Sequence, residues 1–399
     1  MEWKEVTLGE IGTIVGGATP STKNTSFYDG NIPWLTPKDL SVNGNKYIFR
    51  GERNITEAGF KSCSCKMLPK GSVLFSSRAP IGYVAIAAND MCTNQGFKSV
   101  IPNEETDSEF LYYLLKYNKD NIASQGSGTT FAEVSGKTMK DIEVVVPKEK
   151  EDQRRIASIL SSLDRKIELN NKINADLEEM AQAIFKNWFV DFEPFKDGKF
   201  VDSELGMIPE GWKVGTLKDL LYLRKDSIKA ANKGNLPYLP IDTIPMHCLV
   251  ATDFKSNDEA KSSLQTFEQN DIVVGAMRVY FHRVILAPCK GITRTTCFVL
   301  SVKNENALAY SLMQCNQDEA ISFAEKTSKG STMPYAVWDG GYGEYKVVIP
   351  PSEVMKSFND LLSNFFSKMN KNTIENSRLS LLRDTLLPRL MSGELEVPE

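Results

Sequence analysis

The chain has 399 residues, of which 41% are hydrophobic and 25% charged, a composition typical of a soluble globular protein with two or three domains. It contains no apolar run of about 18 residues, and its first residues lack the pattern of a signal peptide, so we expect neither a membrane span nor secretion. Seven cysteines at scattered spacings predict reduced thiols and a cytoplasmic protein.

The first 147 residues have the pattern of a domain built from short strands and turns. Strand-forming runs at 73–75, 83–87 and 142–146 are bounded by Gly and Pro, and residues 110–117 have a helical pattern. A similar pattern in residues 211–350 predicts strands at 272–274, 284–286, 297–302 and 345–349. We therefore predict an α+β chain with two similar mixed α/β domains, 1–147 and 211–350.

One long helix is expected after the first domain. Residues 151–193 contain no Gly or Pro, and Pro194 ends this run. Apolar residues recur at steps of four and three, interrupted by two asparagines, at Ile156, Leu160, Leu163, Ile167, Asn170, Asn174, Leu177, Ala181, Ile184 and Trp188. This spacing is that of a coiled-coil seam and predicts a spacer helix over 148–193. Residues 194–210, with two Gly and two Pro, are expected to form a linker.

The same seam recurs 202 residues later, within residues 351–399. Its positions are Phe358, Leu362, Phe365, Met369, Asn372, Asn376, Leu379, Arg383, Leu386 and Leu390. A polar seam residue fixes register, so the two asparagine pairs predict an antiparallel coiled coil in which Asn170 faces Asn376 and Asn174 faces Asn372. In this pairing Leu163 faces Arg383, whose aliphatic stem can cover apolar surface. The alternative is that the two helices belong to separate cores.

Short motifs recur in the same order in both halves of the chain. Trp3-Lys4 and Thr7-Leu8 recur as Trp212-Lys213 and Thr216-Leu217. Gly128-Thr129-Thr130 recurs as Gly330-Ser331-Thr332, and Val144-Val145-Val146-Pro147 recurs as Val347-Val348-Ile349-Pro350. These recurring motifs predict a pseudo-two-fold internal repeat. Because the two halves have low identity elsewhere, we expect one scaffold used twice with different surfaces.

The sequence contains no recognisable catalytic or metal-binding motif. Its two histidines are His247 and His282, and no His/Cys cluster has metal-ligand spacing. Ser135-Gly136-Lys137-Thr138 resembles the end of a phosphate-binding loop, but Phe131 stands where that loop requires Gly. We therefore expect a binding module with no catalytic residue, no metal and no cofactor in this chain.

Four segments resemble the specificity subunits of type I restriction–modification enzymes. Glu151-Asp152-Gln153-Arg154-Arg155-Ile156 is similar to the start of that family's conserved helix, and residues 183–195 are similar to its end. Residues 203–212 resemble the entry into the second target-recognition domain, and residues 386–395 resemble the end of the chain. One departure is Ser352-Glu353, where the family has a Glu-Gln pair.

The resemblance implies a protein that recognises DNA and performs no chemistry itself. It implies two target-recognition domains, each reading one half of a bipartite site in double-stranded DNA, and a helix pair that holds them apart. It also implies that the helix pair docks two methyltransferase subunits, which bind S-adenosylmethionine and modify adenine. Restriction subunits, in systems that have them, add cleavage driven by ATP with Mg²⁺.

Candidate DNA contacts are polar or basic residues on predicted turns. In the first domain they are Arg50, Arg53, Ser76, Ser77, Arg78, Ser127, Thr129 and Thr130; in the second they are Arg278, Tyr280, His282, Arg294, Thr295, Ser331 and Thr332. Arginine can bond guanine bidentately, and Ser and Thr can bond any base. Arg78 and Arg278 occupy matching positions, so we expect phosphate contacts there, or alternatively structural salt bridges. For Arg50, Arg53 and His282 the alternative is solvated surface.

The overall charge is unusual for a protein that binds DNA. The formal net charge is −4 and the isoelectric point is about 5.6, whereas DNA-binding domains are usually basic. We therefore expect weak DNA binding by this chain alone, with partner subunits neutralising many phosphates. Two other function classes stay open: a protein-interaction scaffold with two binding domains on a coiled-coil spacer, and an enzyme in which His247 or His282 is catalytic.

Overall fold

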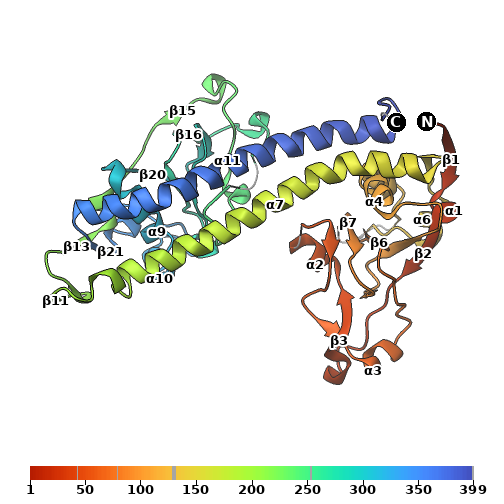
Figure 1. Ribbon diagram of the computed structural model, residues 1–399, viewed down its shortest axis with the longest axis horizontal. Helices are drawn as coiled ribbons and strands as arrows, with labels where there is room; N and C mark the ends of the chain where they lie inside the picture. Colours follow the sequence, from red (N-terminus) through yellow and green to blue (C-terminus); the bar gives the residue numbers. More distant parts are fainter. Residues whose placement is uncertain (43, 79, 128–131, 252–253, 398–399) are drawn as a thin grey trace. The chain divides into compact units, whose positions relative to one another are not determined.

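The computed structural model describes residues 1–42, 44–78, 80–127, 132–251 and 254–397. The chain divides into two compact units, the first formed by Met1–Lys166 with Ser380–Glu399 and the second by Ile167–Leu379. Two helices of 40 residues, α7 (Lys150–Phe189) and α11 (Ser352–Met391), contribute to both units (Figure 1). Among the described residues, no helix has both the length and the apolar character needed to span a bilayer.

The first unit contains two larger sheets besides the pair of strands β1 (Trp3–Thr7) and β10 (Glu143–Pro147). A five-stranded sheet has the order β2-β9-β6-β7-β4, and a three-stranded sheet has the order β5-β3-β8. These strands are β2 (Gly12–Gly16), β3 (Tyr28–Leu35), β4 (Tyr47–Ile48), β5 (Asn54–Ile55), β6 (Val73–Ser77), β7 (Ile81–Ala87), β8 (Cys92–Thr93) and β9 (Lys98–Pro102). The helices are α1 (Leu8–Ile11), η1 (Thr25–Phe27), α2 (Pro37–Val42), α3 (Glu57–Lys61), α4 (Ser108–Tyr117), α5 (Lys119–Ser124) and α6 (Gly136–Asp141).

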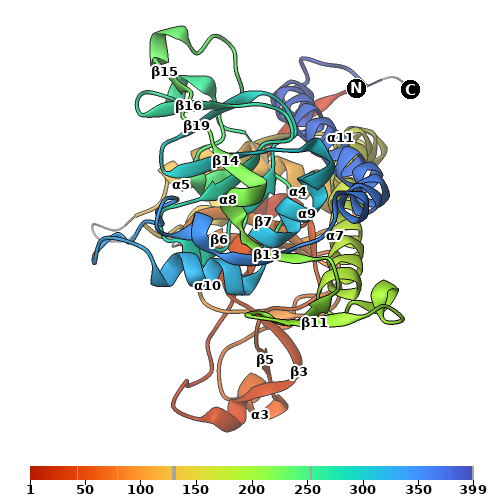
Figure 2. The ribbon, with the colours of Figure 1, turned by 90° about the vertical axis from the view of Figure 1, so that its left-hand side faces the viewer.

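The second unit contains a four-stranded sheet in the order β14-β20-β17-β18 and a three-stranded sheet in the order β15-β16-β19. Figure 2 shows β15, β16 and β19 together. The strands are β14 (Leu221–Leu223), β15 (Ser227–Ile228), β16 (Leu264–Phe267), β17 (Ile272–Gly275), β18 (Val284–Leu286), β19 (Gly291–Arg294) and β20 (Cys297–Val302), preceded by the hairpin of β11 (Phe200–Ser203) and β12 (Gly206–Pro209).

Short helices complete the second unit. The α-helices are α8 (Leu217–Leu220), α9 (Leu308–Cys315) and α10 (Asp318–Lys326). The 3-10 turns are η2 (Glu193–Phe195), η3 (Ala230–Asn232), η4 (Ile241–Thr243), η5 (Asn257–Glu259), η6 (Val279–Phe281), η7 (Glu305–Ala307) and η8 (Tyr342–Glu344).

The internal repeat is visible in the topology of the two units. In the first, β1 (Trp3–Thr7) pairs antiparallel with β10 (Glu143–Pro147); in the second, β13 (Lys213–Thr216) pairs antiparallel with β21 (Lys346–Ile349). Each opening strand leads into a short helix with a capping box, at Thr7 and at Thr216. The strand order β2-β9-β6-β7 corresponds to β14-β20-β17-β18. The predicted α+β fold with two similar domains and an antiparallel helix pair is confirmed.

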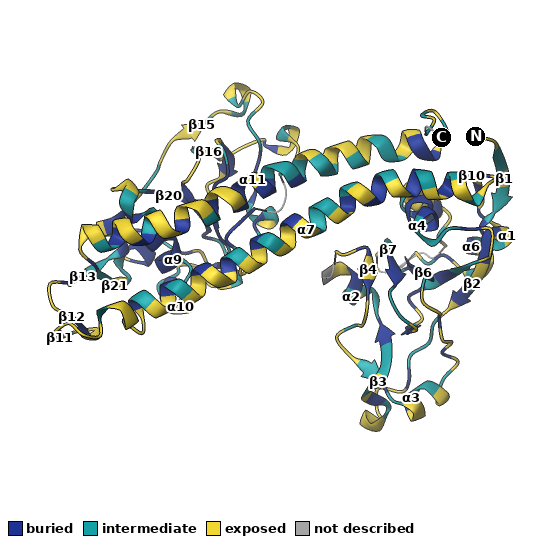
Figure 3. Ribbon diagram, in the orientation of Figure 1, coloured by how far each residue is buried: buried dark blue, intermediate teal, exposed yellow. Residues whose placement is uncertain are grey.

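Each unit buries one face of both long helices. In the first unit, Ile156 and Leu160 of α7 share a core with Leu390 and Met391 of α11 and with the buried side of α4. In the second, the Phe189 ring of α7 lies 4.8 Å from the Phe358 ring of α11, measured between centroids. Figure 3 shows the resulting alternation of buried and exposed residues along both helices. Large buried aromatic rings contribute strongly to such cores.

Two asparagine layers interrupt the apolar seam in the second unit. Asn170 Nδ2 donates to Asn376 Oδ1 at 2.9 Å, and Asn372 Nδ2 donates to Asn174 Oδ1 at 2.8 Å. All four side chains are buried. These are the pairings that the seam spacing predicts, and only one antiparallel register satisfies both, so the layers select that register.

Arg383, the charged residue on the seam in the first unit, forms an ion pair that the sequence did not predict. Arg383 Nη1 lies 2.8 Å from Asp164 Oδ1, and the hydroxyl of Tyr113 on α4 also donates to Asp164. The adjacent seam residue Leu163 is partly buried. A charged residue on the seam is therefore accommodated by a paired carboxylate, in addition to the covering of apolar surface by its stem.

Glu178 of α7 anchors a loop of the second unit. Its Oε2 accepts a hydrogen bond from the backbone N–H of Leu249 at 3.0 Å, and its side chain is buried. Burial raises the pKa of Glu178 above its ordinary value, while the Leu249 bond opposes that rise. The loop that Glu178 holds contains His247.

We predict that the asparagine layers set register and lower stability. Asn376→Ala should reduce the free energy of unfolding by about 1–3 kcal/mol, because it leaves the buried Asn170 amide without this partner. Replacing both residues, Asn170→Leu with Asn376→Leu, should restore or exceed the original stability, because an apolar layer then fills the seam. Urea unfolding followed by circular dichroism measures both, with the exposed Asn187→Ala on α7 as control. A double variant less stable than Asn376→Ala would contradict this account.

We also predict a pH-dependent effect at Glu178. Its raised pKa means that the folded chain holds this proton more tightly than the unfolded chain, so the contribution to stability is full at acid pH and is lost as pH rises through the folded pKa. Glu178→Gln should therefore raise the melting temperature at pH 7 by roughly 2–4 °C, with no gain below the ordinary glutamate pKa of about 4.3. The exposed Glu179→Gln is the matched control. A lower melting temperature at pH 7 would show that the ionised form is the better partner of Leu249.

Candidate nucleic-acid interface

Three segments of the first unit meet at the end of β6. The backbone N–H of Ser77 donates to Gly96 O at 2.8 Å, and the N–H of Val134 donates to Ser77 O at 3.0 Å. Ser127 and Glu133 form an isolated antiparallel bridge next to this point. We call residues 76–78, 94–97, 127 and 132–134 the first loop cluster. It brings together four predicted contacts, Ser76, Ser77, Arg78 and Ser127.

The second unit repeats this arrangement with a different sequence. The N–H of Ala276 donates to Thr296 O at 2.9 Å, and the N–H of Ala336 donates to Ala276 O at 2.8 Å. Lys329 and Tyr335 form an antiparallel bridge, as Ser127 and Glu133 do in the first unit. We call residues 276–278, 294–296 and 329–336 the second loop cluster. It brings together five predicted contacts: Arg278, Arg294, Thr295, Ser331 and Thr332.

The predicted contacts of the first loop cluster differ in exposure. Ser76 and Ser77 are buried. Ser76 Oγ donates to Pro80 O and accepts from Tyr83 N, both at 2.8 Å, and Ser77 Oγ donates to Gly96 O at 3.2 Å. These hydroxyls bond the unit's own backbone. Ser127 is exposed, whereas Thr129 and Thr130 lie outside the described residues.

Arg78 belongs to a small charged group in the first loop cluster. Its Nη1 lies 3.6 Å from Glu133 Oε2, and Lys98 Nζ lies 3.1 Å from Glu133 Oε1. The Arg78 side chain keeps 35% of its surface exposed. Two cations therefore share one carboxylate, which leaves a local excess of positive charge. Such partly exposed pairs contribute little to stability.

The second loop cluster presents more exposed groups. Arg278, Arg294, Thr295, Ser331 and Thr332 are all exposed. Arg278 has φ of 50°, a left-handed conformation, and its N–H donates to Pro334 O at 2.8 Å. This bond ties Arg278 to the loop that carries Ser331 and Thr332. The left-handed backbone is uncommon for a residue with a side chain, so surrounding contacts must hold it there.

The remaining predicted contacts lie outside the loop clusters. Arg53 lies 3.6 Å from Asp29, with its guanidinium 4.3 Å from the centre of the Tyr28 ring. Arg50 is exposed and lines a cleft together with Asp29. Tyr280, on η6, is 43% exposed. His282 is buried at the end of η6, and both its ring nitrogens face oxygen atoms of Asn316 and Asp318.

Sequence reasoning missed three residues that lie in the loop clusters or next to them. Lys98 begins β9 directly beyond the first loop cluster and pairs with Glu133. Lys329 and Tyr335 flank the Gly330-Ser331-Thr332 motif, and Tyr335 is 48% exposed. Extending each recurring Gly-Thr or Gly-Ser motif to the bridge residues on both sides would have included Lys329 and Tyr335.

Comparisons with known proteins identify the family. The family described as "Type I restriction modification DNA specificity domain" matches residues 1–179. The MjaIX specificity subunit of a type I restriction enzyme from Methanocaldococcus jannaschii is 36% identical, over 100% of this chain and 94% of that protein. The HindI specificity subunit from Haemophilus influenzae is 24% identical, over 99% of this chain and 100% of that protein.

A solved structure supports the same assignment at the level of the fold. A type I restriction–modification S subunit from M. genitalium superposes with a TM-score of 0.60 at 17% identity, covering 98% of this chain and 96% of that one. The chain belongs to the family of specificity subunits of type I restriction–modification enzymes. This membership indicates that the chain recognises DNA sequence within a restriction–modification complex. It disfavours the alternative function, a protein-interaction scaffold that does not bind DNA.

Proposed function

We propose that each unit contacts one half of a bipartite DNA site through its loop cluster. The observation that carries this proposal is the repetition of one backbone arrangement with different side chains. Ser77 and Ala276 make equivalent backbone bonds, so Gly96 corresponds to Thr296 and Asn94 to Arg294. A shared scaffold with divergent exposed groups suits the reading of two different half-sites.

The two kinds of position have different proposed roles. Ser77 corresponds to Ala276, so Arg78 corresponds to Met277, and Arg278 lies one residue beyond the position that the sequence predicted. Each loop cluster nevertheless has an arginine at this edge, and these two arginines contact phosphates and fix the position of each unit on the duplex. Arg294, which has no basic counterpart in the first unit, reads a base edge, as guanidinium groups do at guanine O6 and N7. Ser76 and Ser77 support the loops, because their hydroxyls are bonded internally.

The partner subunits supply the chemistry in this proposal. Two methyltransferase subunits dock on the α7–α11 pair, bind S-adenosylmethionine and methylate adenine, and restriction subunits, where the system has them, use ATP and Mg²⁺. This chain contributes recognition, without catalysis, in the cytoplasm. All seven of its cysteines are free thiols, which suits a reducing compartment. Its net charge of −4 favours sharing of phosphate contacts with those partners.

The first test is an exchange of domains. Replacing residues 1–147 with the corresponding domain of another family member should change one half of the recognised sequence and leave the other half unchanged, because each unit has its own core and its own loop cluster. The measurement is the set of methylated motifs produced by the assembled methyltransferase complex. Changes in both halves of the motif would contradict independent reading by the two units.

The second test separates phosphate contact from base reading. In the assembled complex, Arg278→Ala should weaken binding to all duplexes alike. It should also reduce the slope of log affinity against log salt concentration by about one, because one fewer counterion is released on binding. Arg294→Ala should cost about 1–3 kcal/mol on the cognate duplex and relax the preference at one base pair. Competition binding at several salt concentrations measures both effects.

A matched control comes from the same sheet. Lys303 is exposed and follows the far end of β20, whereas the second loop cluster adjoins the start of that strand. Lys303→Ala should therefore leave affinity and salt dependence unchanged. Equal losses from all three substitutions would indicate nonspecific charge attraction and would contradict the assignment of the second loop cluster.

A further inference from the structure

The only two histidines of the chain meet in the second unit. The backbone N–H of His247 donates to His282 O at 2.8 Å, and the centres of the two imidazole rings are 4.4 Å apart. His247 lies in the loop after η4, and His282 directly follows η6. Both residues have left-handed backbones, with φ of 51° and 49°. Such conformations cost of order 1–3 kcal/mol each, so the surrounding structure must hold the pair in place.

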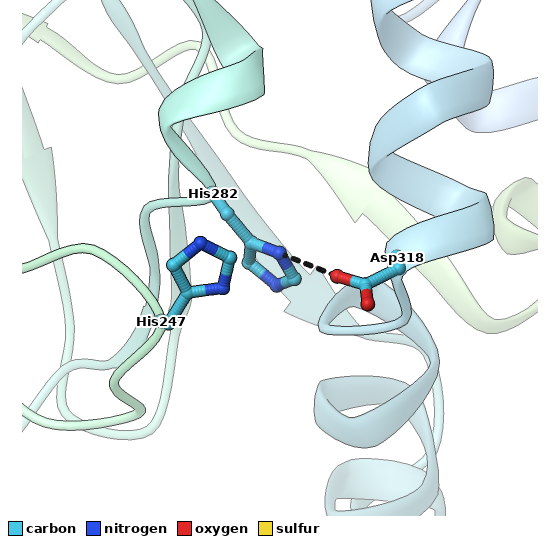
Figure 4. A group of neighbouring side chains, drawn as sticks. All are labelled: His247, His282 and Asp318. Carbon is cyan, nitrogen blue, oxygen red and sulfur yellow. Dashed lines mark ion pairs between the residues drawn. The ribbon is translucent and has the colours of Figure 1, made fainter. Parts of the chain in front are cut away.

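An aspartate from a third element completes the group. Asp318 begins α10, and its Oδ1 lies 3.1 Å from His282 Nδ1. Figure 4 shows His282 between His247 and Asp318. The potential ligand atoms of the three side chains all lie within 4.8 Å of one another. His282 is buried, while His247 and Asp318 are exposed at a cavity of about 690 Å³, which gives solvent access to the group.

Both ring nitrogens of His282 face hydrogen-bond acceptors. Its Nε2 lies 3.1 Å from the backbone carbonyl oxygen of Asn316, which can only accept a hydrogen bond. Its Nδ1 faces the Asp318 carboxylate, which also only accepts when ionised. A neutral imidazole has one N–H and can satisfy only one of these two oxygens. Either a second proton or a metal ion at Nδ1 satisfies both.

A metal ion at Nδ1 of His282 would fit the hydrogen bonding that is usual for histidine ligands. A histidine that binds a metal through one nitrogen usually donates its other N–H to a carbonyl or carboxylate, which fixes the tautomer and the ring orientation. With a metal at Nδ1, the Nε2–H of His282 donates to the Asn316 carbonyl in this way. The oxygen of Asp318 then becomes a second ligand instead of a hydrogen-bond acceptor.

We propose that His247, His282 and Asp318 bind one zinc ion. Two imidazoles and one carboxylate are a donor set that zinc accepts, with a fourth position left for water. Zinc–ligand distances near 2.0–2.1 Å place tetrahedral ligand atoms about 3.3 Å apart, close to the 3.1 Å between His282 and Asp318. His247 is exposed, and in the proposed complex its side chain rotates toward the other two ligands.

The zinc ion ties together three elements of the second unit. These are the loop held by Glu178, turn η6 and the first turn of α10. Turn η6 lies between Arg278 and His282, so the ion also fixes the segment that carries the exposed Tyr280. Any benefit to DNA contact rests on the proposed function, whereas the zinc site itself does not.

The test measures zinc content in the full chain without a polyhistidine tag. After treatment with a chelator and dialysis, the natural chain should take up one zinc ion and gain thermal stability. His247→Ala and Asp318→Asn should lower zinc affinity at least ten-fold, because each removes an exposed ligand. Glu319→Gln, an exposed neighbour of Asp318 at the same cavity, is the matched control and should bind as the natural chain does.

Nitrogen NMR of histidine provides a second readout that does not depend on stability. Because the chain has two histidines, comparing the spectra of the natural chain and His247→Ala assigns the ring nitrogen signals of both residues. Zinc should shift the Nδ1 signal of His282 and leave its Nε2 protonated. The proposal is overturned if zinc does not bind stoichiometrically, if both ligand variants bind it unchanged, or if His282 stays protonated at both nitrogens with zinc present. Neither readout requires DNA, so failure here leaves the proposed function standing.

Discussion

The pairing of α7 with α11 is the constraint on which the structure depends. Apolar seam residues can slide by one heptad at small cost, but buried asparagines cannot, because each must find an amide at the same depth. Asn170 with Asn376 and Asn174 with Asn372 therefore determine which part of each helix faces its partner. The aromatic contacts of Phe358 and the buried Leu390 follow from that register.

Much of this architecture could be predicted from sequence because it is periodic or repeated. The seam predicted the helix pair, and the Val-Val-Val-Pro motif with its copy Val-Val-Ile-Pro marked the strands that precede each long helix, β10 and β21. Ser76 and Ser77 show where such reasoning stops. They follow a predicted strand and look like turn residues, but β6 continues through Ser77 and both hydroxyls are buried. A strand buried on both faces gives no alternation by which to locate its end.

The histidine group could not be predicted, because no local spacing encodes it. His247, His282 and Asp318 come from a loop, a turn and a helix start that are far apart in the sequence. Metal motifs that can be recognised in sequences place at least two ligands on one element. The same limit applies to Arg383, whose partner Asp164 lies on the other long helix. Spacing identified the layer of Arg383 but not the carboxylate that neutralises it.

The placement of Leu390 and Met391 in the core of the first unit has a consequence for biosynthesis. A growing chain emerges from the ribosome in order, so the first 166 residues appear long before the segment that covers Ile156 and Leu160. Until then the part of this core that Leu390 and Met391 cover stays open to water or to other chains. Contacts that close so large a loop also slow folding. Before α11 is synthesised, the nascent subunit therefore exposes apolar surface of the kind that makes folding intermediates prone to aggregate.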